Sequence, residues 1–200
     1  EDKRGRINNL SQILWTNNQD SVGLTLQIPF IQRLIDGTLR DPAFSLCDQQ
    51  DRYFEHVIRP YRRFIRSQNH NDRFSPDEGI KILSNQRASV NHLGIVPIAT
   101  TNAYIDFIFL NADGLPSTIA SLLPCLKLYE FLTQELSRAQ SPRHSYWIRR
   151  HPPDSSRESI DRLEFLMNLD HGNNTARLEK IYRTGLQHEI TFFSQFNRLL

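Results

Sequence analysis

The sequence predicts an all-α protein, a bundle of seven or eight helices. Several long segments repeat apolar residues at alternating spacings of three and four, which is the period of one helix face. No segment shows four or more residues of clean apolar and polar alternation between turn signals, so we expect no strand. Because 200 residues suffice for one full hydrophobic core, we expect a single domain over residues 1–200.

Turn signals divide the first half of the chain into helical segments. The Asp36-Gly37 pair ends the second segment, Asp41-Pro42 begins the third, and Gly94 follows the fourth. The Asn-rich stretch 16–20 weakens the end of the first segment. The predicted helices cover about residues 7–15, 29–35, 41–66 and 77–92.

The second half is divided in the same way. Asp113-Gly114 forms a turn, Ser141-Pro142 begins a further element, and Pro152-Pro153 ends it. Gly172 closes the next helix, and an asparagine at position 173 or 174 caps the last one. The predicted helices cover about residues 100–111, 115–139, 156–169 and 174–200, and the element between the second and third of them covers about 141–152.

The charge pattern argues against a nucleic-acid partner. Lys and Arg number 24 against 22 Asp and Glu, a net charge of +2, and the basic residues are scattered except for the pairs Arg62-Arg63 and Arg149-Arg150. Two isolated cysteines form neither a disulfide framework nor a zinc-site spacing, which favours a reducing compartment. No run of eighteen apolar residues occurs, and the charged residues 1–6 precede no apolar run. We therefore expect a soluble, cytoplasmic protein without a membrane partner.

Polar residues interrupt the apolar faces of four predicted helices. In residues 115–139 the inward face carries the thiol of Cys125 and the phenol of Tyr129 one turn apart, and Pro124 should bend the backbone just before the thiol. Burying an unpaired carboxylate costs several kcal/mol, so inward carboxylates suggest a shared polar cavity. The polar groups on the inward faces of the other helices are Asp51, Tyr104 and Glu189.

Each of these residues also has a purely structural interpretation. A lone cysteine on an apolar face is most often a small hydrophobe, which is how we interpret Cys47. An inward carboxylate often pairs with a buried arginine, and inward tyrosines are more often core residues than ligand contacts. The coincidence of all these groups in one chain favours a polar central site with Cys125 as a nucleophile.

Several catalytic and metal-binding motifs are absent from the sequence. No Glu-x-x-His pair occurs, which excludes the di-iron arrangement of helical bundles. The sequence has no His-Glu-x-x-His motif, no glycine-rich phosphate loop and no Gly-x-Ser-x-Gly turn. The absence of these motifs narrows the possible chemistry.

Short motifs follow one another over nearly the whole chain, from about Leu14 to Phe193. They are Leu14-Trp15, Pro29-Phe30-Ile31, Asp36-Gly37-Thr38-Leu39, Phe44, Gln50-Asp51, Tyr104, Leu122-Leu123-Pro124-Cys125, Tyr129, Trp147-Ile148, Glu189 and Phe192-Phe193. This ordered set resembles the TenA-type thiaminase II proteins, a family with a haem-oxygenase-like helical bundle. The family's fold, activity and assembly are therefore the expectations for this chain.

The resemblance implies a role for each candidate residue. Cys125 is the expected nucleophile, Glu189 the acid/base partner, and Asp51 the group that holds the amino-pyrimidine edge. Tyr104 and Tyr129 are expected to line the ring pocket or to position the thiol. The family also implies a homo-oligomer, a dimer or a tetramer, and a small-molecule pyrimidine substrate.

Two positions depart from the family pattern, because Phe54 and His151 stand where tyrosines are usual. The loss of two hydroxyls removes hydrogen bonds from the substrate pocket. The main alternative is therefore a catalytically silent relative that binds a different small molecule. A cofactor-independent oxidase of the same fold is a weaker alternative, because the Leu-Pro-Cys segment is typical of the thiaminase branch. A protein-interaction module is the third.

The reaction that the resemblance implies belongs to thiamin salvage. It removes a group by hydrolysis from the methylene carbon of 4-amino-5-aminomethyl-2-methylpyrimidine or a related thiamin breakdown product, and it requires no metal or organic cofactor. A thiolate attacks the electron-poor ring, protonation of a ring nitrogen lets the leaving group depart, and water then adds. Because a free thiol titrates at about 8.5, we expect Tyr129 or backbone donors near Pro124 to favour the thiolate.

Overall fold

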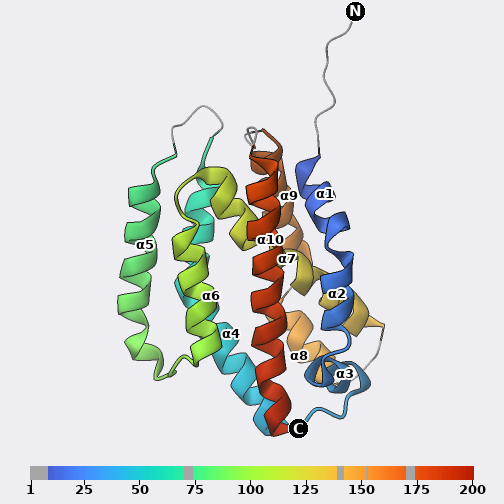
Figure 1. Cartoon of the computed structure of the whole chain (residues 1–200). Helices are drawn as coiled ribbons and strands as arrows, with labels where there is room; N and C mark the ends of the chain where they lie inside the picture. The colour runs from blue at the N-terminus through green and yellow to red at the C-terminus, as the bar shows by residue number, and fades with distance from the viewer. Residues whose placement is uncertain (1–8, 70–73, 139–141, 152, 170–173) are drawn as a thin grey trace, which may run out of the picture.

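The computed structural model describes residues 9–69, 74–138, 142–151, 153–169 and 174–200. Within these ranges the chain forms ten α-helices, two short 3-10 helices and no strand, so the predicted all-α class is confirmed (Figure 1). None of the helices in these ranges combines the length and apolar character that a membrane-spanning segment needs. In chain order the elements are α1 (Leu10–Asn17), α2 (Gln19–Thr25), α3 (Pro29–Asp36), α4 (Asp41–Ser67), α5 (Pro76–Ser89), η1 (Val90–Leu93), α6 (Ala99–Leu110), α7 (Leu115–Ser137), α8 (Pro142–Arg150), α9 (Pro153–Leu169), α10 (Thr175–Ser194) and η2 (Gln195–Leu199).

Several predicted helix ends agree closely with the structure. Glycines with positive φ follow α3 and η1, 78° at Gly37 and 62° at Gly94, as the glycine signals indicated. The helix predicted over about residues 41–66 is α4, which continues through its internal Pro60. The predicted boundaries at residues 7, 139, 141, 152, 172 and 173 lie outside the described residues.

The described residues contain more helices than the seven or eight predicted, and α2 is one that the sequence did not predict. The Asn-rich stretch is not a loop, because Asn18 joins α1 directly to α2 and is fully buried. The side-chain amide of Asn18 donates to the carbonyl oxygen of Leu14 (2.7 Å), and Nε of Arg183 donates to its side-chain oxygen (3.1 Å). The second partner lies on α10, so no local pattern could reveal that this polar residue is satisfied.

Helix α7 is the central helix of the fold. It lies behind α10 in Figure 1 and packs most extensively on α10 and α9. Most of its side chains are buried, on more than one face. Residues two positions apart differ in direction by about 200°, so Cys125 and Lys127 face opposite sides of the helix.

The close approach of α7 and α10 depends on a proline and a glycine. A Cβ atom on Gly185 would lie 2.9 Å from Cγ of Pro124, which is closer than real Cβ contacts. Pro124 directly precedes Cys125, and Gly185 lies one turn before Glu189 on α10. The missing side chain at Gly185 therefore brings Glu189 toward the thiol.

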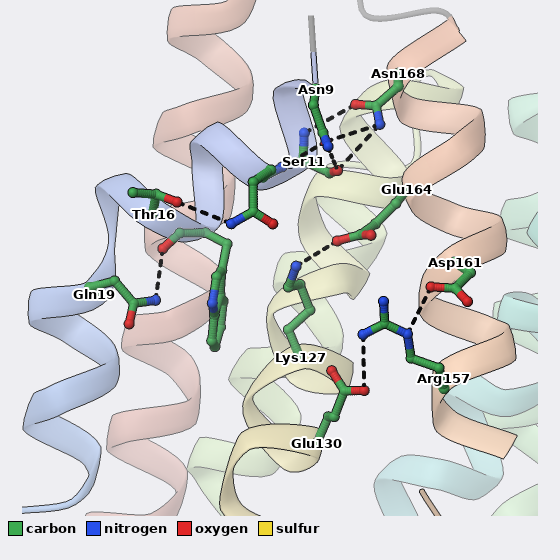
Figure 2. A network of polar contacts seen from close by, with 12 residues as sticks. Asn9, Ser11, Thr16, Gln19, Lys127, Glu130, Arg157, Asp161, Glu164 and Asn168 are labelled. Carbon is green, nitrogen blue, oxygen red and sulfur yellow. Dashed lines mark hydrogen bonds and ion pairs between the residues drawn. The ribbon is translucent and has the colours of Figure 1, made fainter. Parts of the chain in front are cut away.

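Polar contacts hold α9 against α7 and α1 (Figure 2). Nζ of Lys127 donates to Oε1 of Glu164 at 2.5 Å and lies 5.2 Å from the centre of the Trp15 ring. At the upper end, the backbone N–H of Ser11 donates to Oδ1 of Asn168 (3.2 Å). These contacts fix the helices that cover the side of α7 opposite Cys125.

Candidate active site

A small inner chamber lies among side chains of α4, α6, α7 and α10. Its free volume is about 10 Å³, which has room for about one water molecule. All the site residues predicted from the sequence line it, except His151. The side chains around it, all buried, are Asp51, Phe54, Tyr104, Cys125, Tyr129, Glu189 and Phe192.

A larger outer cavity of about 390 Å³ shares a wall with this chamber. Asp51, Cys125 and Tyr129 line both spaces, and His151 lines the outer one. The structure therefore brings every predicted site residue to one pair of adjoining spaces. The other residues that line the outer cavity are Glu55, Arg59, Arg62, Arg63, Arg66, Leu126, Arg149, Arg150 and Ser159.

Asp51 lies in the wall between the two spaces. Oη of Tyr129 donates to its Oδ1 at 3.2 Å, while Nη2 of Arg150 and Nε2 of His151 each lie 3.5 Å from its Oδ2. Burial and the nearby Glu55 carboxylate raise the pKa of Asp51 to about 7, although Arg150 and Tyr129 oppose the rise. At neutral pH this carboxyl group is present in both its protonated and its ionised form.

Glu189 lies on α10 and is 2% exposed. Burial raises the pKa of Glu189 to about 8, and the Tyr104 hydroxyl and Cys125 thiol beside it offset part of the rise. Within the described part of the chain, Oε1 of Glu189 and Oη of Tyr104 have no hydrogen-bond partner at normal distance. Buried polar atoms are rarely left without a partner, so these two are available to a ligand or a water molecule in the chamber.

Cys125 is a protonated thiol at neutral pH. Burial raises the pKa of Cys125 well above its ordinary value, and the carboxylates of Glu189 and Glu55 raise it further, while Arg62 opposes them. The expectation that Tyr129 stabilises a thiolate is wrong, because its hydroxyl donates to Asp51 instead. A sulfur nucleophile at this position would therefore have to lose its proton during a reaction rather than before it.

An aromatic wall closes one side of the outer cavity. The ring of Trp147 stacks on Tyr129 at 5.2 Å and 17°, and the imidazole of His151 lies 4.6 Å from the Tyr129 ring. Burial is the main cause that lowers the pKa of His151 to about 4, so its ring is neutral at pH 7. At the other departure from the family pattern, Phe54 packs 4.9 Å from the Tyr104 ring inside the chamber.

Apart from Asp51, the charged residues that line the outer cavity were not predicted from the sequence as site residues. Nη1 and Nη2 of Arg62 donate to Oε1 (3.0 Å) and Oε2 (2.8 Å) of Glu55, a bidentate pair. Glu55 and three arginines of α4 follow Asp51 at spacings of four, four, three and four, so they share its helix face. This spacing in the sequence could have indicated the charged face of α4, which consists of Asp51, Glu55, Arg59, Arg62 and Arg66.

A metal site is not evident in the residues that the structure describes. They contain no group of three or more His, Cys, Asp or Glu side chains that could hold a metal ion. The chemistry that these groups offer is nucleophilic attack by sulfur with proton transfer by carboxyl groups.

No family model matches the chain. A curated relative is the thiamine biosynthesis multifunctional protein ThiED of Corynebacterium efficiens, 25% identical over 211 residues. That match covers 94% of this chain and 28% of the relative, so the chain spans little more than a quarter of its length.

Solved structures of TenA homologues have the same fold. The TenA homologue from P. horikoshii OT3 superposes with a TM-score of 0.74 at 17% identity, covering 94% of this chain and 98% of that one. A Sulfolobus solfataricus P2 protein described as a TenA-like thiaminase gives 0.72 at 15% identity, with 94% and 96% covered. A TenA family transcription regulator from Silicibacter sp. TM1040 gives 0.70 at 18%, with the same coverage. The chain therefore has the all-α, haem-oxygenase-like fold of TenA homologues, and the resemblance seen in the sequence is confirmed for the fold.

Proposed function

We propose that this chain is a TenA-type hydrolase of thiamin-related aminopyrimidines, with Cys125 as its nucleophile. The observation that carries the proposal is the meeting of one buried thiol with two buried carboxyl groups of raised pKa, Asp51 and Glu189, around one chamber. The curated relative's name refers to thiamine biosynthesis and one structural neighbour is described as a thiaminase, which supports a thiamin-related substrate. The single domain, the homo-oligomer and the cytoplasmic location stay predictions.

Asp51 is suited to hold the amidine-like edge of an aminopyrimidine. A protonated carboxyl group offers one donor and one acceptor, which a ring nitrogen and the neighbouring amino group complement. Its pKa of about 7 keeps a large share of Asp51 in that form at neutral pH. Tyr129, which donates to Oδ1, orients the carboxyl group.

Glu189 supplies and recovers the protons of the reaction. Because its pKa is about 8, it is mostly protonated at pH 7 and can donate to a ring nitrogen. The resulting carboxylate then accepts the proton of the Cys125 thiol while the sulfur bonds to the ring carbon. The aminomethyl group reacts in its ammonium form, so its carbon–nitrogen bond breaks and neutral ammonia leaves.

Water completes the reaction. It adds to the methylene carbon and gives one proton to the released ammonia. The sulfur then leaves with the proton that Glu189 holds, and the ring nitrogen returns its proton to the resulting carboxylate. The net change replaces the amino group with a hydroxyl group and releases ammonia. Glu189 moves the ring and thiol protons, so no cofactor takes part.

A silent, ligand-binding relative is the second candidate. Phe54 has no hydroxyl group beside Tyr104, and burial raises the pKa of the Cys125 thiol well above its ordinary value. One structural neighbour is described as a transcription regulator, so not every similar protein is described as an enzyme. This candidate keeps the pyrimidine pocket but predicts binding without turnover.

The test is incubation with 4-amino-5-aminomethyl-2-methylpyrimidine, followed by mass spectrometry of the hydroxymethyl product. Cys125→Ala should lose at least about a thousandfold in kcat/KM, the scale expected for removal of a nucleophile. Cys47→Ala is the matched control, because Cys47 is also buried, at 3% exposed, and does not line the chamber. Its kcat/KM should stay within about threefold of the wild type.

The two candidates differ in their outcomes. Saturable binding of the aminopyrimidine without product would support the silent relative and reject the hydrolase. Equal turnover by Cys125→Ala and the wild type would reject cysteine catalysis.

A further inference from the structure

Two arginine pairs that lie far apart in the sequence meet at the outer cavity. The pair Arg62-Arg63 is on α4 and the pair Arg149-Arg150 is on α8, and all four residues line the cavity. With two further arginines of α4, six guanidinium groups face two carboxyl groups, Asp51 and Glu55. A cavity that is lined mainly by positively charged side chains attracts an anionic ligand.

Most of these arginines have a carboxylate partner. Glu55 pairs with Arg62 (2.8 Å) and lies 3.5 Å from Arg59. Of the remaining two with partners, Arg66 lies 2.8 Å from Glu158, and Arg150 lies 3.3 Å from Asp48 and 3.5 Å from Asp51.

Arg63 and Arg149 differ from the others. Neither has an ion-pair partner among the residues that the structure describes, and Arg149 lies 6.0 Å from the centre of the Tyr146 ring. Both are exposed, whereas Asp51 and Cys125 are buried, so these two arginines form the rim of the cavity and the thiol its floor. Within the described part of the chain, two guanidinium groups are therefore available to an incoming anion at the rim.

The rim arginine of α4, Arg63, lies well away from the expected ring position. A helix rises about 1.5 Å per residue, so the Cα atom of Arg63 is about 18 Å along α4 from that of Asp51. Side chains on a helix tilt toward its N-terminus, so the guanidinium of Arg63 leans back toward Asp51. An anion held there cannot be attached to the ring itself and must be carried by a substituent that extends out of the chamber.

We propose that the outer cavity binds a phosphate monoester on the leaving group of the substrate, across the scissile methylene bond from the pyrimidine. This inference rests on the proposed function, since Cys125 and Asp51 place the ring at the floor. Phosphate is favoured over a carboxylate because it carries up to two negative charges and several acceptor oxygens, which two arginine forks can hold. The class of substrate is therefore an aminopyrimidine joined through a methylene group to a phosphorylated leaving group.

Thiamin and thiamin monophosphate form a matched pair of probes, because they share the ring and the methylene bond and differ in one phosphate. The wild type should show a kcat/KM at least about tenfold higher for the phosphate ester, at constant ionic strength. The double variant Arg63→Gln, Arg149→Gln should lose most of that preference. The control Arg138→Gln should keep it, because Arg138 directly follows α7, is 73% exposed, and pairs with Glu135 away from the cavity.

Binding measurements separate this inference from the proposed function. Isothermal titration of the Cys125→Ala protein should show tighter binding of thiamin monophosphate than of thiamin, and inorganic phosphate should compete while acetate should not. Turnover of thiamin with no preference for its phosphate would overturn the inference and leave the hydrolase intact. Equal competition by acetate would also overturn it, in favour of a carboxylate ligand. Preferential, arginine-dependent binding without any turnover would support the phosphate site and reject the hydrolase.

Discussion

Two buried side chains on opposite faces of α7, Lys127 and Cys125, have different surroundings. On one face, Lys127 (8% exposed) is matched by Glu164 on α9 at 2.5 Å (Figure 2). On the other face, Cys125 meets Glu189 and Asp51, and Oε1 of Glu189 has no hydrogen-bond partner in the described residues. Lys127 therefore has a partner of opposite charge, whereas the pKa values of Cys125, Asp51 and Glu189 are all raised.

Under the proposed function, the ion pair of Lys127 and Glu164 serves structure and the cluster around Cys125 serves chemistry. A buried ion pair whose partners match holds two helices together and leaves no group free for a ligand. Acidic groups buried side by side raise each other's pKa, a cost that a fold does not need for stability but that acid/base chemistry at neutral pH uses. Variants on the two faces of α7 should therefore affect different properties.

The largest change in stability should come from breaking the structural pair. Lys127→Met leaves the carboxylate of Glu164 without its partner and should lower the free energy of unfolding by about 3 kcal/mol. The double variant Lys127→Met, Glu164→Leu should recover at least half of that loss. Urea denaturation measures both, and turnover per folded molecule should stay unchanged. A single-variant loss below about 1 kcal/mol would place this pair among surface salt bridges.

Glu189→Gln should show the opposite behaviour, with greater stability at high pH. The folded pKa of Glu189, about 8, lies above its ordinary value of 4.5, so its stabilising contribution is complete below pH 4.5 and is lost as the pH rises through 8. The variant lacks this loss and should exceed the wild type on the order of 3 kcal/mol at pH 9, with little difference near pH 4. Thermal unfolding across this range tests the difference, and parallel curves for the two proteins would contradict it. Turnover should be lost with the proton donor.

The contact that brings the two helices together offers a third comparison. Gly185→Ala places a Cβ atom against Pro124 and should lower the free energy of unfolding by about 1–3 kcal/mol, with a fall in turnover because Glu189 moves away from Cys125. Gly23→Ala is the matched control, because Gly23 is also helical and nothing lies within 4 Å of the added atom. That control should gain about 0.5–1 kcal/mol through helix propensity. Urea denaturation and kcat/KM are the measurements, and a stabilised Gly185→Ala protein would refute the close-contact interpretation.

The smallest effect should come from one hydroxyl of the chamber. Tyr129→Phe removes the donor to Asp51, which should raise KM for the aminopyrimidine about fivefold, the scale of one hydrogen bond of about 1 kcal/mol. Tyr61→Phe removes a comparable bond to Thr118 at 3.1 Å outside the chamber, and it should change stability but not KM. Steady-state kinetics of both variants separate a substrate contact from a packing contact. Equal KM values would show that Asp51 needs no orientation by Tyr129.

Much of the site followed from helical periodicity. The inward placement of Asp51, Cys125 and Glu189 was predictable because a buried helix face repeats every three or four residues, and a polar residue in that register is visible in the sequence. All three are buried in the structure. The direction of their pKa shifts was only partly predictable, because the pKa of Cys125 depends on carboxylates from α4 and α10.

Other features had no local pattern. Lys127 on α7 gave no indication of its partner Glu164, because the pair is 37 residues apart and joins two helices. The sequence did not predict α2, because this helix begins in an Asn-rich stretch. The buried Asn18 before it has a hydrogen-bond partner, Arg183, only across the fold. Charged residues at a cavity rim follow no apolar period, so nothing in the sequence indicated that the two arginine pairs meet at one cavity.

The sequence by itself determined the all-α class, the main helices and the side of each helix that faces inward, because these depend on chain-local geometry and on the burial of apolar side chains. The tertiary structure decided that sulfur and carboxyl groups meet around one chamber, and that four arginines from α4 and two from α8 line one cavity. Such meetings depend on how helices cross, and here on the contact between Pro124 and Gly185. Contacts between distant segments are set by packing of the whole core, which no single stretch of sequence contains.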